Sequence, residues 1–380
     1  MNLELESRDK ELLDIWRDLA KNRIGPLSQK VDQNASLFDE LLDVLEKSEL
    51  LKPFLPAELG GEGCGLMSLA LLLEEVGKTS PVVAILMAQQ VIVGIRALLR
   101  VSNHPQRQEW AREAASFRML FPIAATESAA GSDLHSIETV CSACPADSDG
   151  SFTIRGGKSY VNQAGRARAF LTMARLEGKE PPSASMFFVP RDTPGVRIGD
   201  ALLTMGMAGL EAAPVEFREV MVSADALAGV HGFGYDLYNQ IMHEMRIAIG
   251  AIAVGISQGA FDEAAQHTKK KKQQGKSLNT FQSLQWRFSD AAVRIDGSRM
   301  HVWRAVEQAA EKNPVYTFAA MAKIFATESA CAVTDFAVQA MGSQGYLRGS
   351  LSERLFRDAR FLKIGFGTSE TLRNLVSTRL

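Results

Sequence analysis

Apolar residues recur at three- and four-residue spacing along the first 120 residues. This pattern predicts amphipathic helices over 11–20 and 38–51, the second ending before Pro53 and Pro56. Two further segments, 66–77 and 81–99, are apolar on nearly every face, which predicts helices buried against other helices. A charged stretch over 100–116 is predicted to be a connector.

The pattern changes near Met119, where short runs rich in β-branched and aromatic residues follow one another. Turn signals at Asp149-Gly150, Gly156-Gly157 and 190–195 separate several of them. This spacing is typical of a β-sandwich or barrel. The predicted strands are 121–126, 139–144, 151–155, 169–174, 185–189, 195–198 and 215–222.

Helical spacing returns near Gly234, with long apolar stripes over 234–266, 283–310, 316–339 and 351–364. Four such helices with short joints predict a four-helix bundle. We therefore predict an α+β protein with an N-terminal all-α domain at 1–118, a middle β-barrel or sandwich domain at 119–230 and a C-terminal bundle at 231–380.

Composition and charge narrow the function classes. The 380 residues carry 42 Lys and Arg against 44 Asp and Glu, so no overall attraction for nucleic acid or an anionic membrane is expected. The charged N-terminus and the absence of an obvious membrane-spanning run predict a soluble, cytoplasmic protein. Cys141 and Cys144 have CxxC spacing but no second pair, so we predict no metal site.

The C-terminal segment predicts a sharp corner. A charged helix is interrupted at Gly365-Phe366-Gly367, and a second helix restarts with Thr368 or Ser369 as its N-cap. Such a corner exposes backbone N–H groups and aims one side chain into a pocket. That side chain is Phe366.

Four motifs, in this order, resemble those of the acyl-CoA dehydrogenase flavoproteins, and the resemblance covers essentially the whole chain. The first two, in the predicted β-domain, are Ala125-Thr-Glu-Ser-Ala-Ala-Gly-Ser-Asp133 and Gly157-Lys-Ser-Tyr-Val-Asn-Gln163. The other two are Gln339-Ala-Met-Gly-Ser-Gln-Gly-Tyr346 and Glu353-Arg-Leu-Phe-Arg-Asp-Ala359. The resemblance implies the fold predicted above and FAD as the cofactor.

The first two motifs have side chains suited to a flavin ring. Thr126 and Ser132 supply hydroxyls, the loop around Gly131 supplies backbone N–H donors, and Tyr160 offers a ring to cover one flavin face beside the donor Asn162. The alternative is that these residues only cap and pack a sheet edge.

The resemblance implies a second set of cofactor contacts from a neighbouring subunit. Lys271 and Gln274 stand where the family has an arginine on the FAD pyrophosphate and a phenylalanine, so the charge is kept but the bidentate fork and the aromatic contact are lost. A solvated helix end is the alternative for these lysines. The predicted cofactor-binding residues are Thr126, Gly131, Ser132, Tyr160, Asn162, Lys271, Gln274, Gln339, Gly342, Ser343, Thr368 and Glu370.

In the family the corner carries a glutamate that removes the α-proton of an acyl-CoA thioester while a hydride leaves the β-carbon. Phe366 cannot accept a proton. Some members place the base before an arginine on the first bundle helix, and here Met245 precedes Arg246. Glu244 is one residue away, a rotation of about 100°, and is the alternative base. Arg246 and Ser132 are the predicted substrate contacts.

Three hypotheses remain open. In the first, the chain is the base-lacking subunit of a hetero-oligomeric dehydrogenase, with a homologous subunit that carries the glutamate. In the second, it is a homo-oligomeric flavoenzyme with altered chemistry, such as a relocated base, desulfination or oxygenation. In the third, it is a non-catalytic scaffold. The implied partners are acyl-CoA or acyl-pantetheine and an electron acceptor such as an electron-transfer flavoprotein, in a tetrameric assembly.

Overall fold

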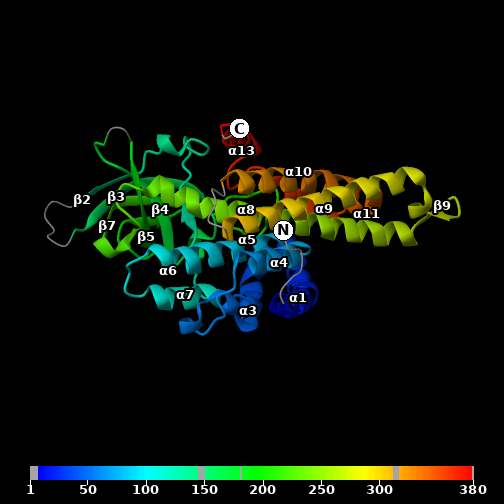
Figure 1. Ribbon diagram of the computed structural model, residues 1–380, viewed down its shortest axis with the longest axis horizontal. Helices are drawn as coiled ribbons and strands as arrows, with labels where there is room; N and C mark the ends of the chain where they lie inside the picture. The colour runs from blue at the N-terminus through cyan, green and yellow to red at the C-terminus, as the bar shows by residue number, and fades with distance from the viewer. Residues whose placement is uncertain (1–6, 144–149, 180–181, 311–315, 379–380) are drawn as a thin grey trace.

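The computed structural model describes residues 7–143, 150–179, 182–310 and 316–378 (Figure 1). The predicted N-terminal helices are present as α1 (Ser7–Leu19), α3 (Phe38–Ser48), α4 (Leu66–Gly77) and α5 (Pro81–Gln89). After α5 the chain continues without a break through a π-helical stretch, Gln90–Ala97, into α6 (Leu98–Val101). The periodicity therefore located these helices correctly.

Two helices of this region were not predicted. The supposed connector over 100–116 contains α7 (Arg107–Ala115), and α2 (Gly25–Gln33) lies between the first two predicted helices. Both are short and mainly polar, and α2 buries only Ser28 and Val31. Their apolar faces are too small to produce a recognisable stripe.

Residues Pro81–Val101 form a helix that is long and apolar enough to cross a membrane, which our reading of the sequence did not anticipate. Its apolar window is 89% buried inside the protein, as in the core helix of a globular fold. The π-helical stretch carries Gln90, whose amide donates to the carbonyls of Ala114 and Met119 and accepts from the N–H of Phe121. This helix therefore anchors the start of the β-domain.

The predicted strands form one mainly antiparallel sheet, in the order β6-β7-β3-β2-β4-β5-β8. Strand β4 pairs in parallel with both β1 and β2. An additional strand, β8, was not predicted because it has only two residues. The strands are β1 (Ile123–Ala124), β2 (Val140–Ala143), β3 (Phe152–Val161), β4 (Ala169–Leu176), β5 (Ala184–Pro190), β6 (Val196–Ile198), β7 (Ala213–Val222) and β8 (Leu227–Ala228).

Strands β4 and β5 are buried on both faces. Leu171 and Phe188 belong to the core formed by the helices, whereas Phe170 and Phe187 belong to a separate core inside the β-domain. Alternate side chains of a strand point to opposite faces, so these two strands join the two cores. The β-domain is therefore packed on the helices through one face of its sheet.

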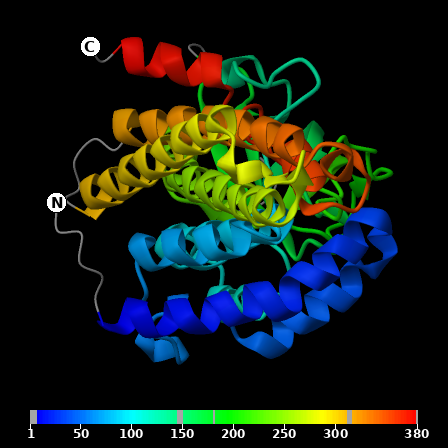
Figure 2. The ribbon, with the colours of Figure 1, turned by 90° about the vertical axis from the view of Figure 1, so that its right-hand side faces the viewer.

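The C-terminal bundle consists of α8 (Gly234–Lys270), α9 (Gln282–Ala310), α10 (Tyr316–Met341) and α12 (Leu351–Leu362), as predicted (Figures 1 and 2). A hairpin, β9 (Lys272–Gln273) and β10 (Lys276–Ser277), joins α8 to α9, and the short α11 (Ser343–Tyr346) follows α10. Helix α13 (Ser369–Ser377) ends the described chain.

Glycines let α8 approach α4 closely. A Cβ atom at Gly255 would meet the carbonyl oxygen of Glu74 at 2.3 Å, and one at Gly259 would meet that of Lys78 at 2.1 Å. The N-terminal helices and the bundle consequently share one hydrophobic core, although they are separate segments of the sequence.

A buried polar junction on α12 joins all three parts of the chain. The Arg357 guanidinium donates to both carboxylate oxygens of Asp32 on α2, at 3.0 and 2.7 Å, and to the carbonyl of Met205. The next residue, Asp358, accepts the N–H of Met207 at 2.5 Å. Burial raises the pKa of the Asp358 carboxyl to about 6, despite the nearby guanidinium of Arg354.

We expect this carboxyl to give the fold a distinctive pH dependence. Its pKa is about 6 when folded against an ordinary value of 3.8, so its stabilising contribution is complete below 3.8 and is lost as the pH rises through 6. From pH 7 to pH 4 the unfolding free energy of the wild type should therefore rise by roughly 2–3 kcal/mol relative to Asp358→Asn.

Urea unfolding at several pH values measures this difference. Asp335→Asn, which alters an exposed carboxylate on α10, is the matched control. If the unfolding free energies of the wild type and Asp358→Asn changed in parallel with pH, the junction would not favour the protonated form of the Asp358 carboxyl.

Candidate functional site

The corner between α12 and α13 has the predicted form. Phe366 and Gly367 adopt left-handed backbone angles, with φ of 60° and 95°, and Thr368 caps α13 by accepting the N–H of Thr371 at 3.2 Å. Phe366 is half-buried, packs against the helical core and meets the ring of Phe361 edge-on at 6.3 Å. Within the described chain, the peptide N–H groups of Phe366 and Gly367 donate no hydrogen bond, so they are available to a ligand.

Two cationic side chains lie beneath the corner. The Lys323 amine, from α10, donates to the carbonyl of Gly367 at 2.6 Å, and a Cβ atom at Gly367 would lie 3.7 Å from Nη2 of Arg246 on α8. Burial and the charge of Arg246 lower the pKa of Lys323 to about 7. Burial also lowers the pKa of Arg246.

His243 lies one turn before Arg246 on α8, with its Nδ1 atom 3.3 Å from Nη1 of that residue. Burial and the Arg246 charge lower the pKa of His243 to about 3, so its ring is neutral and weakly basic near neutral pH. Its Nε2 atom and the Nε atom of Arg246 have no hydrogen-bond partner among the described residues. The corner thus sits over polar groups that are incompletely paired.

Glu244 is directed toward the N-terminal helices. Its carboxylate accepts from Arg96 Nε at 2.8 Å and from Arg100 Nη1 at 3.2 Å. Met245, at the other position expected for a base, is fully buried and apolar. The two arginines compete with any ligand for the Glu244 carboxylate, an arrangement that favours a structural role for it.

The loop between β1 and β2 is fixed by a buried ion pair. The Lys158 amine, on β3, donates to the Glu127 carboxylate at 2.7 Å and to the carbonyl of Ala125 at 3.1 Å. The same carboxylate accepts the N–H groups of Glu138 and Thr139, so it ties the beginning of the loop to its end. Burial lowers the pKa of Lys158 to about 8, although the charge of Glu127 opposes the shift.

The predicted flavin contacts gather around this loop. Gly131 and Ser132 are exposed on it, and Thr126 is half-buried at its start, where its carbonyl accepts the N–H of Ser159. Tyr160 is 62% exposed with φ of 55°, at a bulge of β3, and half-buried Asn162 directly follows this strand. An exposed aromatic ring in a strained backbone conformation suits a residue that packs against a ligand.

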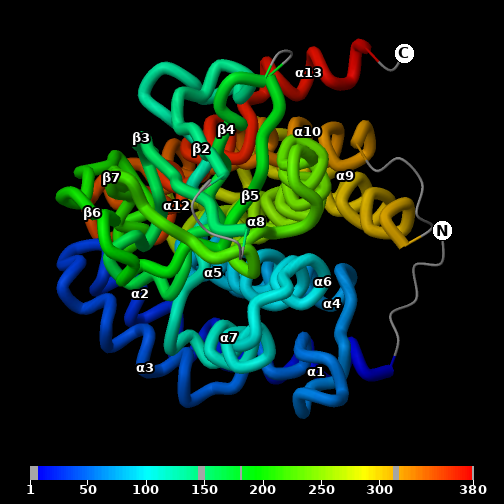
Figure 3. Tube along the Cα trace, turned by 90° about the vertical axis from the view of Figure 1, so that its left-hand side faces the viewer, coloured from blue at the N-terminus to red at the C-terminus, as the bar shows by residue number. Residues whose placement is uncertain are grey.

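Figures 2 and 3 show α13, which Thr368 caps and which contains Glu370, beside the segment that leads from β1 to β2. The remaining predicted cofactor residues lie elsewhere. Lys271 and Gln274 are exposed at the hairpin between α8 and α9, at the opposite end of the molecule from β3 (Figure 1). Gln339, Gly342 and Ser343 are exposed at the C-terminal end of α10 and the start of α11.

The two sets of predicted cofactor residues are therefore separated within one chain. The second set is the one that the resemblance assigns to FAD bound by a neighbouring subunit.

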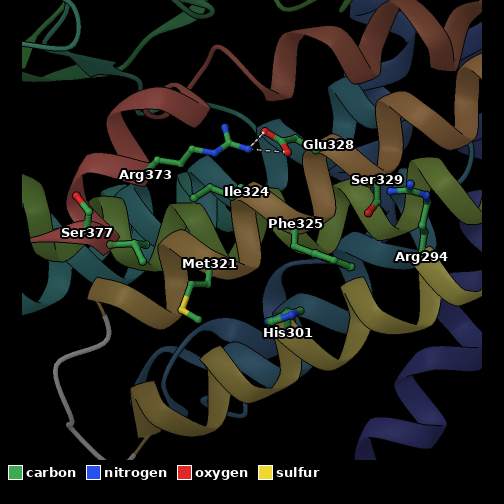
Figure 4. Close-up of a pocket in the computed structure, with 10 residues that line it drawn as sticks. Arg294, His301, Met321, Ile324, Phe325, Glu328, Ser329, Arg373 and Ser377 are labelled. Carbon is green, nitrogen blue, oxygen red and sulfur yellow. Dashed lines mark hydrogen bonds and ion pairs between the residues drawn. The ribbon is translucent and has the colours of Figure 1, made fainter. Parts of the chain in front are cut away.

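A cavity of about 600 Å³ lies on another side of the bundle, between α9, α10 and α13 (Figure 4). Arg373 pairs across it with Glu328 at 2.7 Å, and the rings of His301 and Phe325 are 5.0 Å apart at their centres. None of the predicted site residues lines it. The lining residues are Arg294, His301, Met321, Ile324, Phe325, Glu328, Ser329, Arg373, Val376 and Ser377.

Glu127 and Lys158 lie inside two of the motifs, but no local pattern indicates their roles, and none singles out Lys323. Opposite charges 31 residues apart do not indicate a pair until the strands are placed. Lys323 lies in an alanine-rich helix, where one lysine among apolar residues is a weak signal for a buried amine. Of the two cysteines with CxxC spacing, Cys141 is buried, whereas Cys144 lies outside the described residues.

Comparison with known proteins gives matches over the whole chain. The family models for the N-terminal, middle and C-terminal domains of acyl-CoA dehydrogenase match residues 6–118, 122–220 and 231–380. Cyclohex-1-ene-1-carbonyl-CoA dehydrogenase of Geobacter metallireducens is 32% identical over 99% of this chain and 98% of its own. The short-chain specific acyl-CoA dehydrogenase of Homo sapiens mitochondria is 28% identical over 100% of this chain and 91% of its own.

Among solved structures, butyryl-CoA dehydrogenase from Megasphaera elsdenii superimposes with a TM-score of 0.91 at 26% identity. The match covers 100% of this chain and 99% of that one. The architecture predicted from the sequence is therefore confirmed.

The ion pair beneath the β1–β2 loop gives a stability prediction. In Lys158→Met the Glu127 carboxylate loses its cation while staying buried, and we expect a loss of roughly 3–5 kcal/mol in unfolding free energy by urea titration. Arg155→Met, on the same strand, removes a pair with Glu177 that is about half exposed, and should cost about 1 kcal/mol or less. Equal losses in the two variants would contradict a special role for the buried pair.

Proposed function

Because the chain belongs to the acyl-CoA dehydrogenase family, we propose that it is the base-lacking subunit of a hetero-oligomeric, FAD-dependent acyl-thioester dehydrogenase. Members of this family are flavin oxidoreductases that use FAD. The observation that carries the proposal is the side chain at the corner, because Phe366 occupies the position from which a carboxylate would take the substrate α-proton.

The residues around the β1–β2 loop fit a flavin. Tyr160 offers an exposed ring, the loop around Gly131 offers backbone N–H donors, and Thr126 adds a hydroxyl. When bound, FAD would accept the hydride from the substrate β-carbon. The Glu127–Lys158 pair would keep this loop in place, since it fixes both ends of the segment.

The corner retains the means to polarise a thioester. The unpaired N–H groups of Phe366 and Gly367 could donate to the carbonyl oxygen, and the positive charge of Arg246 lies close to them. Donors aimed at an oxygen that gains negative charge lower the barrier to removal of the α-proton. This part of the chemistry would thus survive without a carboxylate.

Among the described residues, neither Glu244 nor His243 replaces the missing base well. Phe366 and Met245 have no acid–base chemistry, and the Glu244 carboxylate is held by Arg96 and Arg100. His243 is too weakly basic, because its pKa has fallen to about 3. A second, homologous chain with an intact glutamate is the simplest source of activity.

The separation of the predicted cofactor residues also supports an oligomer. We propose that Lys271, Gln274, Gln339, Gly342 and Ser343 contact the pyrophosphate and adenosine of FAD bound mainly by a neighbouring subunit. We further propose a tetramer in the cytoplasm, acyl-CoA or acyl-pantetheine as the substrate, and an electron-transfer flavoprotein as the electron acceptor.

A second candidate is a homo-oligomeric flavoenzyme of the same fold that performs desulfination, oxygenation or dehydrogenation with a relocated base. The loop that carries Gly131 and Ser132, and the exposed Tyr160, favour it because they suit a flavin bound by this chain itself. A non-catalytic scaffold, which would bind an acyl thioester or a partner protein without redox chemistry, is the third candidate.

Expression alone and together with a homologous chain that carries the glutamate distinguishes these candidates. We expect the chain to co-purify with that homologue, and a saturated acyl-CoA to bleach the flavin absorbance only in the mixed complex. A yellow homo-oligomer that is reduced by acyl-CoA would contradict the subunit proposal and favour the second candidate. A protein that is colourless in every assembly would leave the non-catalytic scaffold as the remaining candidate.

Restoring the carboxylate tests the corner directly. In the flavin-loaded complex, Phe366→Glu should increase the rate of flavin reduction by this subunit's site by about 10²–10⁴-fold, the usual contribution of a general base. Phe366→Gln is the control, since glutamine resembles glutamate in size and polarity but cannot accept the proton. Stopped-flow absorbance measures both, and equal rates for the two variants would refute the proposed role of position 366.

A further inference from the structure

The corner rests on the buried amine of Lys323. Lys323 is fully buried, and the only hydrogen bond of its amine among the described residues runs from Nζ to the carbonyl of Gly367, at 2.6 Å. It forms no ion pair with any acid in the described part of the chain, and neither does Arg246 beside it. Two neighbouring buried cations therefore lack a carboxylate.

The charged groups that act on Lys323 come from two of the elements packed against α10. Helix α8 presents Arg246, and α13 presents Glu370, whose side chain is exposed. His243 and Tyr238 on α8 also adjoin Arg246, and both are uncharged at neutral pH, the first because its pKa is about 3 and the second because burial raises its pKa. No group of α9 or α12 among the described residues contributes to the shift of Lys323.

The missing acid is the one at the corner itself. A carboxylate at position 366 would lie next to Gly367, whose carbonyl accepts from Lys323, and one at position 245 would lie next to Arg246. These positions carry Phe366 and Met245 instead. Without it, burial and the repulsion of Arg246 favour loss of a proton from the amine. A negative charge brought to the corner would reverse that preference.

The hydrogen bond to Gly367 depends on the same proton. An ammonium group makes a stronger bond to a carbonyl than a neutral amine does. Fixing the Gly367 carbonyl limits rotation about the backbone of this glycine, whose φ of 95° is easily changed, and so limits the directions of the peptide N–H groups at 366 and 367. Protonation of Lys323 therefore tightens the part of the corner that faces a ligand.

We propose that Lys323 is a positioning residue that orders the corner in its ammonium form and takes up a proton when a negatively charged group occupies the place of the absent carboxylate. This role rests on the proposed function, since it supposes that a thioester oxygen is bound at the corner. Lys323 does not touch the reacting atoms; it acts through the Gly367 carbonyl.

Calorimetric titration of the flavin-loaded complex with acetoacetyl-CoA tests the role, because this thioester readily forms an enolate. The affinity for the enolate form, with the ligand's own ionisation taken into account, should fall by about tenfold between pH 6 and pH 8.5, as the ammonium form of Lys323 is lost. Forming the enolate releases a proton from the ligand, so titrations at pH 7.5 in two buffers of different ionisation enthalpy should show that most of this proton is taken up by Lys323 and does not reach the buffer.

Variants at position 323 separate positioning from general stability. Lys323→Met should lose both the pH dependence and the proton uptake, whereas Lys323→Gln, which still donates but cannot titrate, should recover affinity while its pH profile stays flat. Lys363→Met removes a cation just before the corner and should behave as the wild type does. If Lys323→Gln kept the wild-type pH profile, the proposal would be wrong.

A complex that binds thioester without any effect of Lys323 refutes only this inference, whereas failure to bind flavin or thioester in any assembly refutes the proposed function.

Discussion

The Arg357 guanidinium joins parts of the chain that are more than 150 residues apart in sequence. It bridges α2, the loop that precedes β7, and α12, while Asp358 fixes the same loop from the next position. A buried guanidinium needs nearly all of its donors paired, which it achieves only when all three parts are in place. Helix α12 leads directly into the corner at 365–367, so the position of the candidate site depends on this junction.

The site combines two kinds of electrostatic environment. Beneath the β1–β2 loop, Lys158 and Glu127 neutralise each other and leave a rigid, nearly neutral support. Beneath the corner, Arg246 and Lys323 form no ion pair with an acid in the described part of the chain, so the charge there is unbalanced. A flavin needs a fixed surface, whereas a thioester that gains negative charge benefits from an excess of positive potential.

The sequence predicted most of the architecture, because long helices and repeated short strands leave periodic patterns of apolar residues. It did not reveal α2, α7 or β8, whose buried faces are too short. For the site, motif order pointed to the corner and to the β1–β2 loop, and Phe366 stood out through its chemistry. The roles of Lys323 and of the Glu127–Lys158 pair depend on contacts across distant segments, and no local pattern encodes them. The residue assignments for FAD and substrate stay predictions.

The glycine contact between α4 and α8 limits how the molecule can open. With Gly255 and Gly259 set directly against the backbone of the opposing helix, no layer of side chains lies between them that could slide or repack. The two helical segments must then behave as a single rigid block. Ligand access would depend on the loops of the sheet domain and on the corner before α13, so the kinetics of entry and release should respond to changes in those segments far more than to changes along the α4–α8 seam.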